Sequence, residues 1–256
     1  AAGRTAFGRA RGGPPNDWGA YQFDLAGTAA PRRWATVAYG SRVIPDPAGK
    51  QFVVHDFVSR TIDLTDVDSG KTGRLAEGDF GTPVWSPDGA SLAWGSTGPE
   101  GIVVFDPANE SRSVFADCSP DRGELDWRPG GGALLFRHVD GTEGSPRCAT
   151  QVLDLATGRL VTVSELRAEA QAHVWSPDGS RIAVGRVEPR KAGAPQIVIE
   201  LHDWPEGETR TLTMPAGLTG VHPIPDGERL FLDWDREWKR IFVTGPALPG
   251  TSIAID

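Results

Sequence analysis

Val84–Trp94 reads VWSPDGASLAW, and variants of this stretch recur along the chain. In each copy a few residues that we expect to be extended precede a Pro/Asp/Gly turn, and a short apolar run follows. The other copies are VWSPDGSRIAVGR at Val174–Arg186, LDWRPGGGALLF at Leu125–Phe136, HPIPDGERLFL at His222–Leu232 and a fainter IPDPAGKQFVV at Ile44–Val54. The turn prolines at positions 47, 87, 129, 177 and 225 are therefore 40, 42, 48 and 48 residues apart. Such regular spacing indicates one structural unit built several times.

Each repeat is long enough for four short strands. Strand A precedes the Pro/Asp/Gly turn, strand B follows it, and strands C and D form a hairpin. In the repeat that holds Trp85 these strands are Thr82–Trp85, Ser91–Gly95, Gly101–Phe105 and Arg112–Phe115. This period and strand content are typical of a β-propeller. We therefore predict an all-β, six-bladed β-propeller with four-stranded antiparallel blades, and five blades is the alternative count.

The predicted units form a single domain, because one four-stranded unit cannot bury its own faces without neighbours. The units are roughly residues 1–38, 39–78, 79–118, 119–166, 167–216 and 217–256. The first unit lacks a strand A: RTAFGR at Arg4–Arg9 matches strand B, and Ala20–Leu25 and Arg32–Val37 follow as C and D. We expect either that residue 1 is not the natural start of the propeller or that the first blade has three strands.

The sixth unit is predicted to have strands A to D at Gly220–Ile224, Arg229–Asp233, Lys239–Thr244 and Thr251–Ile255. The link Gly245–Gly250 spans at most about 20 Å. That length suits a hairpin better than a crossing to the first unit.

The net charge of −8 argues against a sequence-independent nucleic-acid binder, because such a protein needs a basic face. No apolar run reaches the length of a membrane span, and no signal peptide is recognisable. We expect any export signal or lipid anchor to lie upstream of Ala1. We also expect a monomer that needs no cofactor.

WSPDG followed by a short apolar strand, and a strand C that ends in Asp, as in FDPANES at Phe105–Ser111, resemble the PD40 or WD40-like repeat of TolB-type propellers. The resemblance covers essentially the whole chain. It implies the propeller fold and a non-catalytic binding module, as TolB-like propellers commonly are. Prolyl-oligopeptidase-type enzymes and some metal-dependent polysaccharide lyases carry related propellers. TolB's N-terminal α/β domain has no counterpart in this sequence, and neither has an α/β-hydrolase domain with its G-x-S-x-G elbow.

The Ser-Pro-Asp-Gly turns have the composition that a tight turn requires. Proline presets φ, aspartate hydrogen-bonds its own backbone, and glycine takes positive φ. The alternating carboxylates of an EF-hand calcium loop are missing. We therefore assign a structural role to these turns and to Trp85, Trp127 and Trp175, which occupy one repeat position.

The chain has two cysteines. Cys118 is expected in the D–A loop that enters the fourth unit, and Cys148 in the B–C loop of that unit. Both loops emerge on one face because propeller strands alternate in direction, so a bridge is geometrically possible. We predict a Cys118–Cys148 disulfide, with two separate free thiols as the alternative. The disulfide in turn predicts an extracytoplasmic location, whether secreted, periplasmic or in the cell envelope.

The five histidines, at positions 55, 138, 173, 202 and 222, show no zinc-ligand spacing. His55 and His138 end B strands and His173 begins an A strand, so these three are expected to face one rim. His202 is expected at the opposite rim. A shared metal is the weaker alternative, and we predict no metal site.

Insertions gather on the rim formed by the B–C and D–A loops. Long B–C loops are expected at Arg9–Gly19, Val139–Thr150 and Val187–Pro195. Loops collected on one face mark a binding face, or else reflect neutral drift of exposed loops. The B strands also end in polar residues there, which the inside of a blade does not favour. We predict that the ligand-binding residues are His55, Asp56, Arg137, His138, Arg186 and Asp233.

Two functional hypotheses follow. The first is a non-catalytic binding module that presents the B–C/D–A rim to a protein or glycan partner. The second is a propeller enzyme, a lyase or hydrolase, that uses His55, His138 and Arg137 as acid/base and charge-stabilising groups at the channel mouth. No nucleophile–base pair or ligand set stands out, so we favour the first hypothesis and predict no catalytic residues. Charge swaps at Arg137 or Arg186 should then weaken binding and leave stability nearly unchanged.

Overall fold

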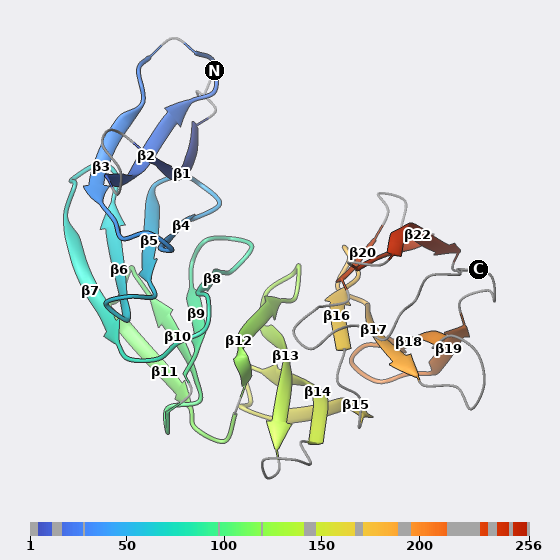
Figure 1. Cartoon of the computed structure of the whole chain (residues 1–256). Coiled ribbons are helices and arrows are strands. Elements are labelled where there is room, and N and C mark those ends of the chain that lie inside the picture. Colours follow the sequence, from blue (N-terminus) through green and yellow to red (C-terminus); the bar gives the residue numbers. More distant parts are fainter. Residues whose placement is uncertain are drawn as a thin grey trace. The chain divides into compact units, whose positions relative to one another are not determined.

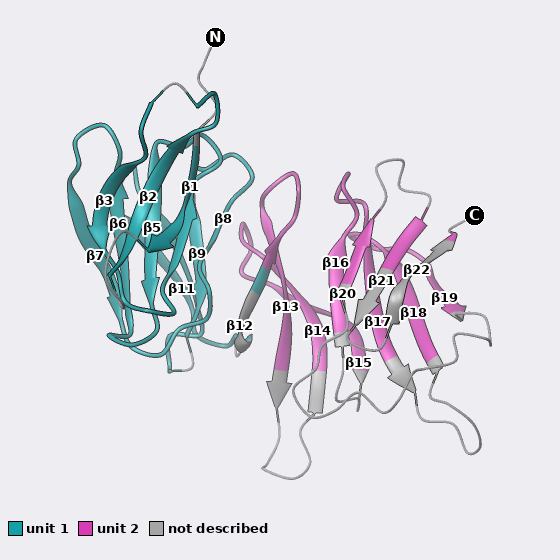
Figure 2. Cartoon of the chain, turned by 45° about the horizontal axis from the view of Figure 1, so that its top comes forward, with its two compact units in different colours: residues 1–125 teal, residues 126–256 magenta. Residues whose placement is uncertain are grey.

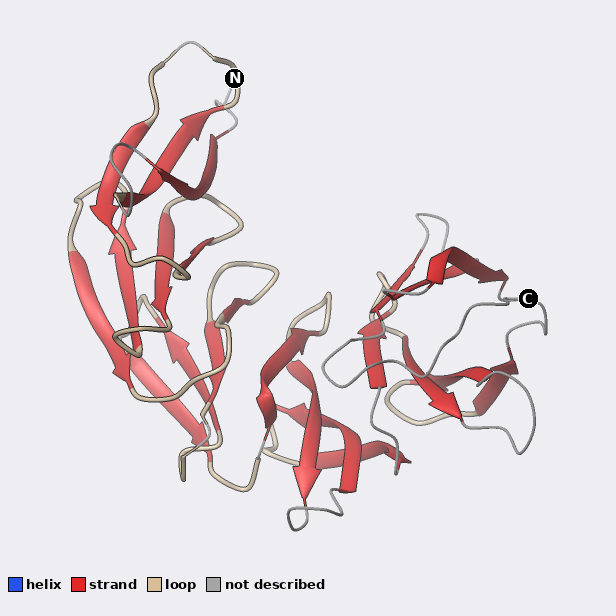
Figure 3. Ribbon diagram, in the orientation of Figure 1, coloured by secondary structure: helices blue, strands red, loops and turns tan. Residues whose placement is uncertain are grey.

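The protein is described by a computed structural model in which only strands, turns and loops are found (Figure 3). The described residues are 5–11, 17–27, 29–96, 98–118, 120–140, 147–166, 171–188, 196–213, 231–234, 240–245 and 248–254. No helix occurs within these ranges. The prediction of an all-β fold is confirmed.

The chain divides into two compact units, Ala1–Leu125 and Asp126–Asp256 (Figure 2). The single domain over residues 1–256 and the six ranges assigned to its repeats stay predictions.

The first unit contains three antiparallel sheets whose strands are neighbours along the chain (Figure 1). The first sheet has three strands, β1 (Thr5–Arg11), β2 (Trp18–Asp24) and β3 (Arg32–Thr36). The second sheet has four, β4 (Arg42–Pro45), β5 (Gln51–Asp56), β6 (Thr61–Asp66) and β7 (Thr72–Glu77). The third sheet has four, β8 (Val84–Trp85), β9 (Leu92–Gly95), β10 (Ile102–Asp106) and β11 (Ser111–Phe115).

The second unit repeats this arrangement. Its first sheet has β12 (Pro120–Trp127), which begins in the first unit, β13 (Ala133–Asp140), β14 (Arg147–Asp154) and β15 (Leu160–Leu166). The next sheet has β16 (Gln171–Trp175), β17 (Arg181–Glu188), β18 (Gln196–Asp203) and β19 (Thr209–Thr213). The last sheet has β20 (Phe231–Trp234), β21 (Arg240–Gly245) and β22 (Leu248–Ala254).

These strands lie within a few residues of the predicted ones. The first sheet has three strands, as one of the two expectations for the first repeat required. β21 and β22 pair antiparallel, so the predicted hairpin at the end of the chain is confirmed. The predicted strand A at 220–224 lies outside the described residues. The number of blades stays a prediction.

The repeated turns are stabilised by their own side chains, as predicted. In the turn after β8, the Ser86 hydroxyl donates to Asp88 Oδ1 at 2.6 Å and accepts from the Ser91 amide at 2.9 Å. Gly89 adopts a φ of 71°, which a side chain would disfavour. The turn after β16 repeats the same contacts between Ser176, Asp178 and the Arg181 amide. These polar groups satisfy one another within the turn.

The repeated tryptophans are buried, in keeping with the structural role predicted for them. Trp85, Trp127 and Trp175 are 9%, 8% and 3% exposed. The Trp85 indole donates to the Ile44 carbonyl of the second sheet at 3.2 Å. Its ring lies in one hydrophobic cluster with Val53 of β5 and Phe105 of β10. Each such cluster fills the space between two successive sheets.

The predicted disulfide is wrong, because Cys118 is a free cysteine. Its side chain is 1% exposed, and its carbonyl packs so closely over Gly101 that a Cβ on Gly101 would lie 2.5 Å from it. Burial, with a smaller effect of Asp117, raises the pKa of the thiol to about 11. The residue thus turns inward at the end of β11 and packs against its own sheet instead of standing on a rim.

Candidate functional site

The candidate site lies where β1 and β5 end and where β2 and β4 begin, at one end of the first two sheets (Figure 1). This is the B–C and D–A end of the repeats, on which the binding rim was predicted. We define the rim patch by the apolar and cationic side chains gathered there. Its members are Arg9, Trp18, Tyr39, Arg42, Phe57 and Val58.

One half of the rim patch is a stack of Arg9, Trp18 and Tyr39. The guanidinium carbon of Arg9 lies 4.5 Å from the centre of the Trp18 ring and 5.5 Å from that of Tyr39. The two rings are 5.7 Å apart. The Val37 amide donates to the Trp18 carbonyl at 2.9 Å, which directs the loop after β3 across the start of β2. Tyr39 is 71% exposed.

The other half is built on the register between β4 and β5, which places Arg42 opposite His55. The His55 ring lies 4.1 Å from the Phe57 ring, centre to centre, and Arg42 Cζ lies 5.6 Å from the centre of the Phe57 ring. Arg42 also donates to Thr82 Oγ1 at 2.8 Å. His55 is 2% exposed, and burial, together with the nearby Arg42, lowers its pKa to about 4. The imidazole is therefore neutral near pH 7, and its ring packs against the ring of Phe57.

Asp56 shapes the turn that carries the exposed part of the rim patch. Its Oδ1 accepts from the amides of Val58 at 2.8 Å and Ser59 at 3.1 Å. Burial alone would raise the pKa of this carboxyl, but these amide bonds outweigh it and hold the pKa below its usual value. The turn leaves Phe57 and Val58 45% and 72% exposed.

The other four predicted site residues lie in the second unit. Arg137 and His138 are half-buried on β13, and Asp233 is exposed on β20. Arg186 on β17 is ion-paired with Glu200 on β18. His55 and Asp56 belong to the first unit. That all six predicted ligand-binding residues surround one channel mouth therefore stays a prediction.

Arg186 sits in a polar layer that joins two neighbouring sheets of the second unit. Ser164 on β15 donates to Glu200 Oε2 at 2.7 Å, and His202 Nε2 lies 3.5 Å from the same oxygen. Burial, with a smaller contribution from Arg137, lowers the pKa of His173 to about 4. The surroundings of Arg186 are those of a packing contact between sheets.

Sequence reasoning missed the aromatic and aliphatic members of the rim patch. Trp18, Tyr39, Phe57 and Val58 lie within or just beside the loops that were predicted to form the rim, whereas the predicted site residues were polar residues at strand ends. Large apolar residues beside loops of this kind were the available signal. Glu200 was also missed. A single Glu among the apolar residues of QIVIELHD indicates a carboxylate that needs a partner inside the fold.

The described residues contain no group of three or more His, Cys, Asp or Glu side chains placed to hold a metal ion. The Nδ1 atoms of His55, His138 and His173 are buried and have no hydrogen-bond partner among the described residues. The long B–C insertions at 12–16, 141–146 and 189–195 lie outside the described residues. Nor does any helix in the described part of the chain have the length and apolar character of a membrane span.

No protein-family model matches the chain. No curated protein matches it either. Solved structures do resemble it. TolB from Acinetobacter baumannii is 19% identical, with a TM-score of 0.52, over 96% of this chain and 61% of that one. The β-propeller domain of Myceliophteria thermophila Cps50 (Swd1) is 16% identical, with a TM-score of 0.55, over 94% and 78%. An oligogalacturonate lyase in complex with manganese is 14% identical, with a TM-score of 0.57, over 92% and 71%.

These likenesses show the fold. The chain has the all-β propeller fold of TolB-type and WD40 domains, as the resemblance of its repeats implied. It spans 61% of the length of the TolB chain, so the activity and partners of that whole protein do not transfer with the fold.

Proposed function

We propose that this propeller is a non-catalytic binding module that docks a protein partner on its rim patch. The observation that carries the proposal is the exposure of Tyr39, Phe57 and Val58, which are 71%, 45% and 72% accessible although they are large and apolar. Aromatic residues and arginine are the side chains most enriched at the energetic centres of protein interfaces. Apolar side chains gathered on a surface and bordered by polar groups mark an interaction site.

The charges of the rim patch favour an acidic partner. Arg9 and Arg42 form no ion pair with any residue that the structure describes. Acidic residues of the same loops are already engaged, since Asp17 pairs with Arg33 and Asp79 with Arg60. The six members of the patch therefore carry two positive charges and no negative one, with the Asp56 carboxylate beside them, in a chain of net charge −8. A complementary surface carries carboxylates around an apolar centre.

A protein fits the patch better than a glycan does. Sugars stack on open aromatic faces, but Arg9 lies over the Trp18 ring and His55 packs against Phe57. The most exposed member, Val58, is aliphatic. The enzyme alternative receives no support from this site, because His55 is buried and Asp56 is committed to its turn.

The extracytoplasmic location rested on the predicted disulfide. The free thiol of Cys118 removes that support, and the location has no part in the proposal.

A random peptide display library tests the proposal. We expect the selected peptides to combine acidic with aromatic or aliphatic residues. Their affinity should fall at least about tenfold on Val58→Asp or Arg42→Glu, the equivalent of about 1.4 kcal/mol. The matched control is Val114→Asp, which changes another valine of the first unit that is 50% exposed. Peptides that bind all three variants equally well would refute the rim patch as the docking surface.

A further inference from the structure

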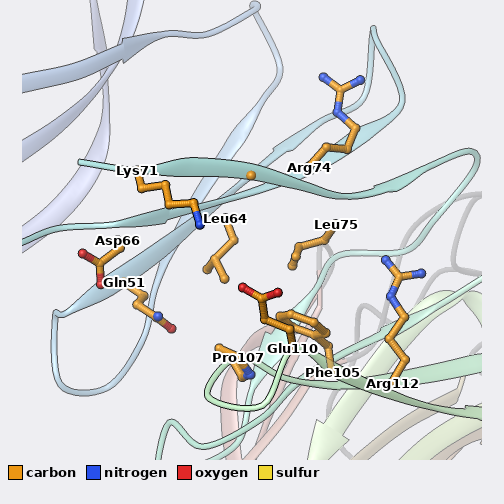
Figure 4. Close-up of a pocket in the computed structure, with 11 residues that line it drawn as sticks. Gln51, Leu64, Asp66, Lys71, Arg74, Leu75, Phe105, Pro107, Glu110 and Arg112 are labelled. Carbon is orange, nitrogen blue, oxygen red and sulfur yellow. The ribbon is translucent and has the colours of Figure 1, made fainter. Parts of the chain in front are cut away.

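A cleft of about 400 Å³ opens in the first unit between the β6–β7 hairpin and β10–β11 (Figure 4). It lies at the end of the second sheet opposite to the rim patch. Gln51, which lines the cleft, pairs with Asp66 at one end of β5–β6, whereas Asp56 pairs with Thr61 at the other end. The volume of the cleft is within the range of about 300–1,000 Å³ found for small-ligand sites.

The cleft is lined at one point by Gly73, the second residue of β7, which has no side chain to fill it. Gly73 pairs with Leu64 in the register of β6 and β7, and it lines the cleft. A Cβ added to Gly73 would meet no atom within 4 Å, so a side chain has room there. Its φ is not positive, so the backbone does not require glycine. Glycine weakens a strand interior, and it often marks a place where a ligand approaches the backbone closely.

The lining combines an apolar floor with charges of both signs. Leu64, Leu75 and Phe105 form the floor, and Lys71 and Glu110 point over it from opposite sides (Figure 4). Lys71 and Glu110 form no ion pair with any described residue. Arg74, by contrast, is occupied by Asp63 at 2.8 Å and Glu77 at 3.6 Å. The two unengaged charges thus stand at either side of an apolar surface.

We propose that this cleft binds a short peptide segment in which an apolar side chain lies between an acidic and a basic one. The apolar side chain occupies the notch at Gly73, the acidic group pairs with Lys71, and the basic group pairs with Glu110. A peptide supplies these three groups at the spacing of successive residues.

The test uses two acetylated and amidated tripeptides, Asp-Leu-Lys and Lys-Leu-Asp, titrated into the whole chain and followed by amide chemical shifts. We expect at least one of them to bind saturably and to shift the amides of Gly73 and Phe105. Ser-Leu-Ser, which lacks both charges, and Asp-Gly-Lys, which lacks the apolar group, should each bind at least about tenfold more weakly.

Gly73→Leu fills the notch and should abolish this binding, because the added side chain takes the place of the peptide's leucine. Gly130→Leu is the matched control, since a Cβ at Gly130 also meets open space, and it should leave binding unchanged. Lys71→Gln and Glu110→Gln keep the shape of the cleft and should each weaken binding about tenfold. Absence of saturable binding to the native chain, or binding that survives Gly73→Leu, overturns the proposal.

Val58→Asp separates this site from the rim patch. It should leave tripeptide binding intact while it removes docking at the other end of the sheets. Loss of both on Val58→Asp would contradict a separate site in the cleft.

Discussion

The guanidinium of Arg186 on β17 contacts the carboxylate of Glu200 on β18, and the two side chains are only 13% and 16% exposed. Ser164 and His202 approach the same carboxylate, so the pair is the centre of a polar layer inside the second unit. A buried ion pair of this kind contributes little net stability while both partners are present. Removal of the carboxylate takes a charged acceptor away from both Ser164 and Arg186 inside this layer, which is costly.

Glu200→Gln should therefore lower the free energy of unfolding by about 1–3 kcal/mol, because the Ser164 hydroxyl and the Arg186 guanidinium both lose a charged acceptor. Urea denaturation measures the change. The control Glu208→Gln alters an exposed carboxylate beside β19 and should cost less than about 0.5 kcal/mol. Replacement of both Arg186 and Glu200 by Met should recover most of the loss. A cost below about 1 kcal/mol for Glu200→Gln would show that the layer is well hydrated.

Asp126 should make stability depend on pH. Burial raises its pKa from 3.8 to about 6, although a bond from the Trp175 amide at 3.4 Å partly opposes this. A raised carboxyl pKa contributes stability that is fully present below about pH 4 and is lost as the pH rises through about 6. Asp126→Asn cannot ionise, so its stability relative to the native chain should rise by about 2 kcal/mol between pH 4 and pH 8. A difference that stays constant over this range contradicts an elevated pKa.

Cys118 should behave as an unreactive thiol in the folded chain. It is 1% exposed and burial raises its pKa to about 11, so little thiolate forms and little of it is accessible. A thiol reagent at pH 8 should label Cys118 slowly in the native state and rapidly after unfolding without reductant, as judged by peptide mass spectrometry. Detection of a peptide in which Cys118 is bonded to Cys148 would instead support the disulfide.

Ser176→Ala should destabilise the turn after β16. The Ser176 hydroxyl is 2% exposed, donates to Asp178 and accepts from the Arg181 amide at 2.9 Å. Its loss leaves that amide without its partner, at a cost of about 1–3 kcal/mol in thermal or urea unfolding. Ser180→Ala, in the same turn but exposed, should cost less than about 0.5 kcal/mol. Equal losses of stability in the two variants would show that the burial of Ser176 does not account for the cost.

Much of the fold could be predicted from the sequence because its causes are local. The turn between β8 and β9 is closed by Ser86, Asp88 and Gly89, which are neighbours along the chain. The apolar runs on either side then pair as hairpins, and repetition of this unit implies sheets that pack on one another. The position of the rim could also be predicted, since strand direction alone decides at which end the loops emerge.

Which side chains meet across two sheets was decided by tertiary structure alone. Cys118 turns inward because the chain after β11 packs on Gly101. Arg186 meets Glu200, and Glu200 meets Ser164, because the faces of two sheets come together there, and no spacing in the sequence encodes that contact. The notch at Gly73 exists only because β10 and β11 lie across from β7. Local chemistry determined the strands and turns, whereas packing between sheets determined which polar groups are buried and which surfaces stay open, because those outcomes depend on residues far apart in the chain.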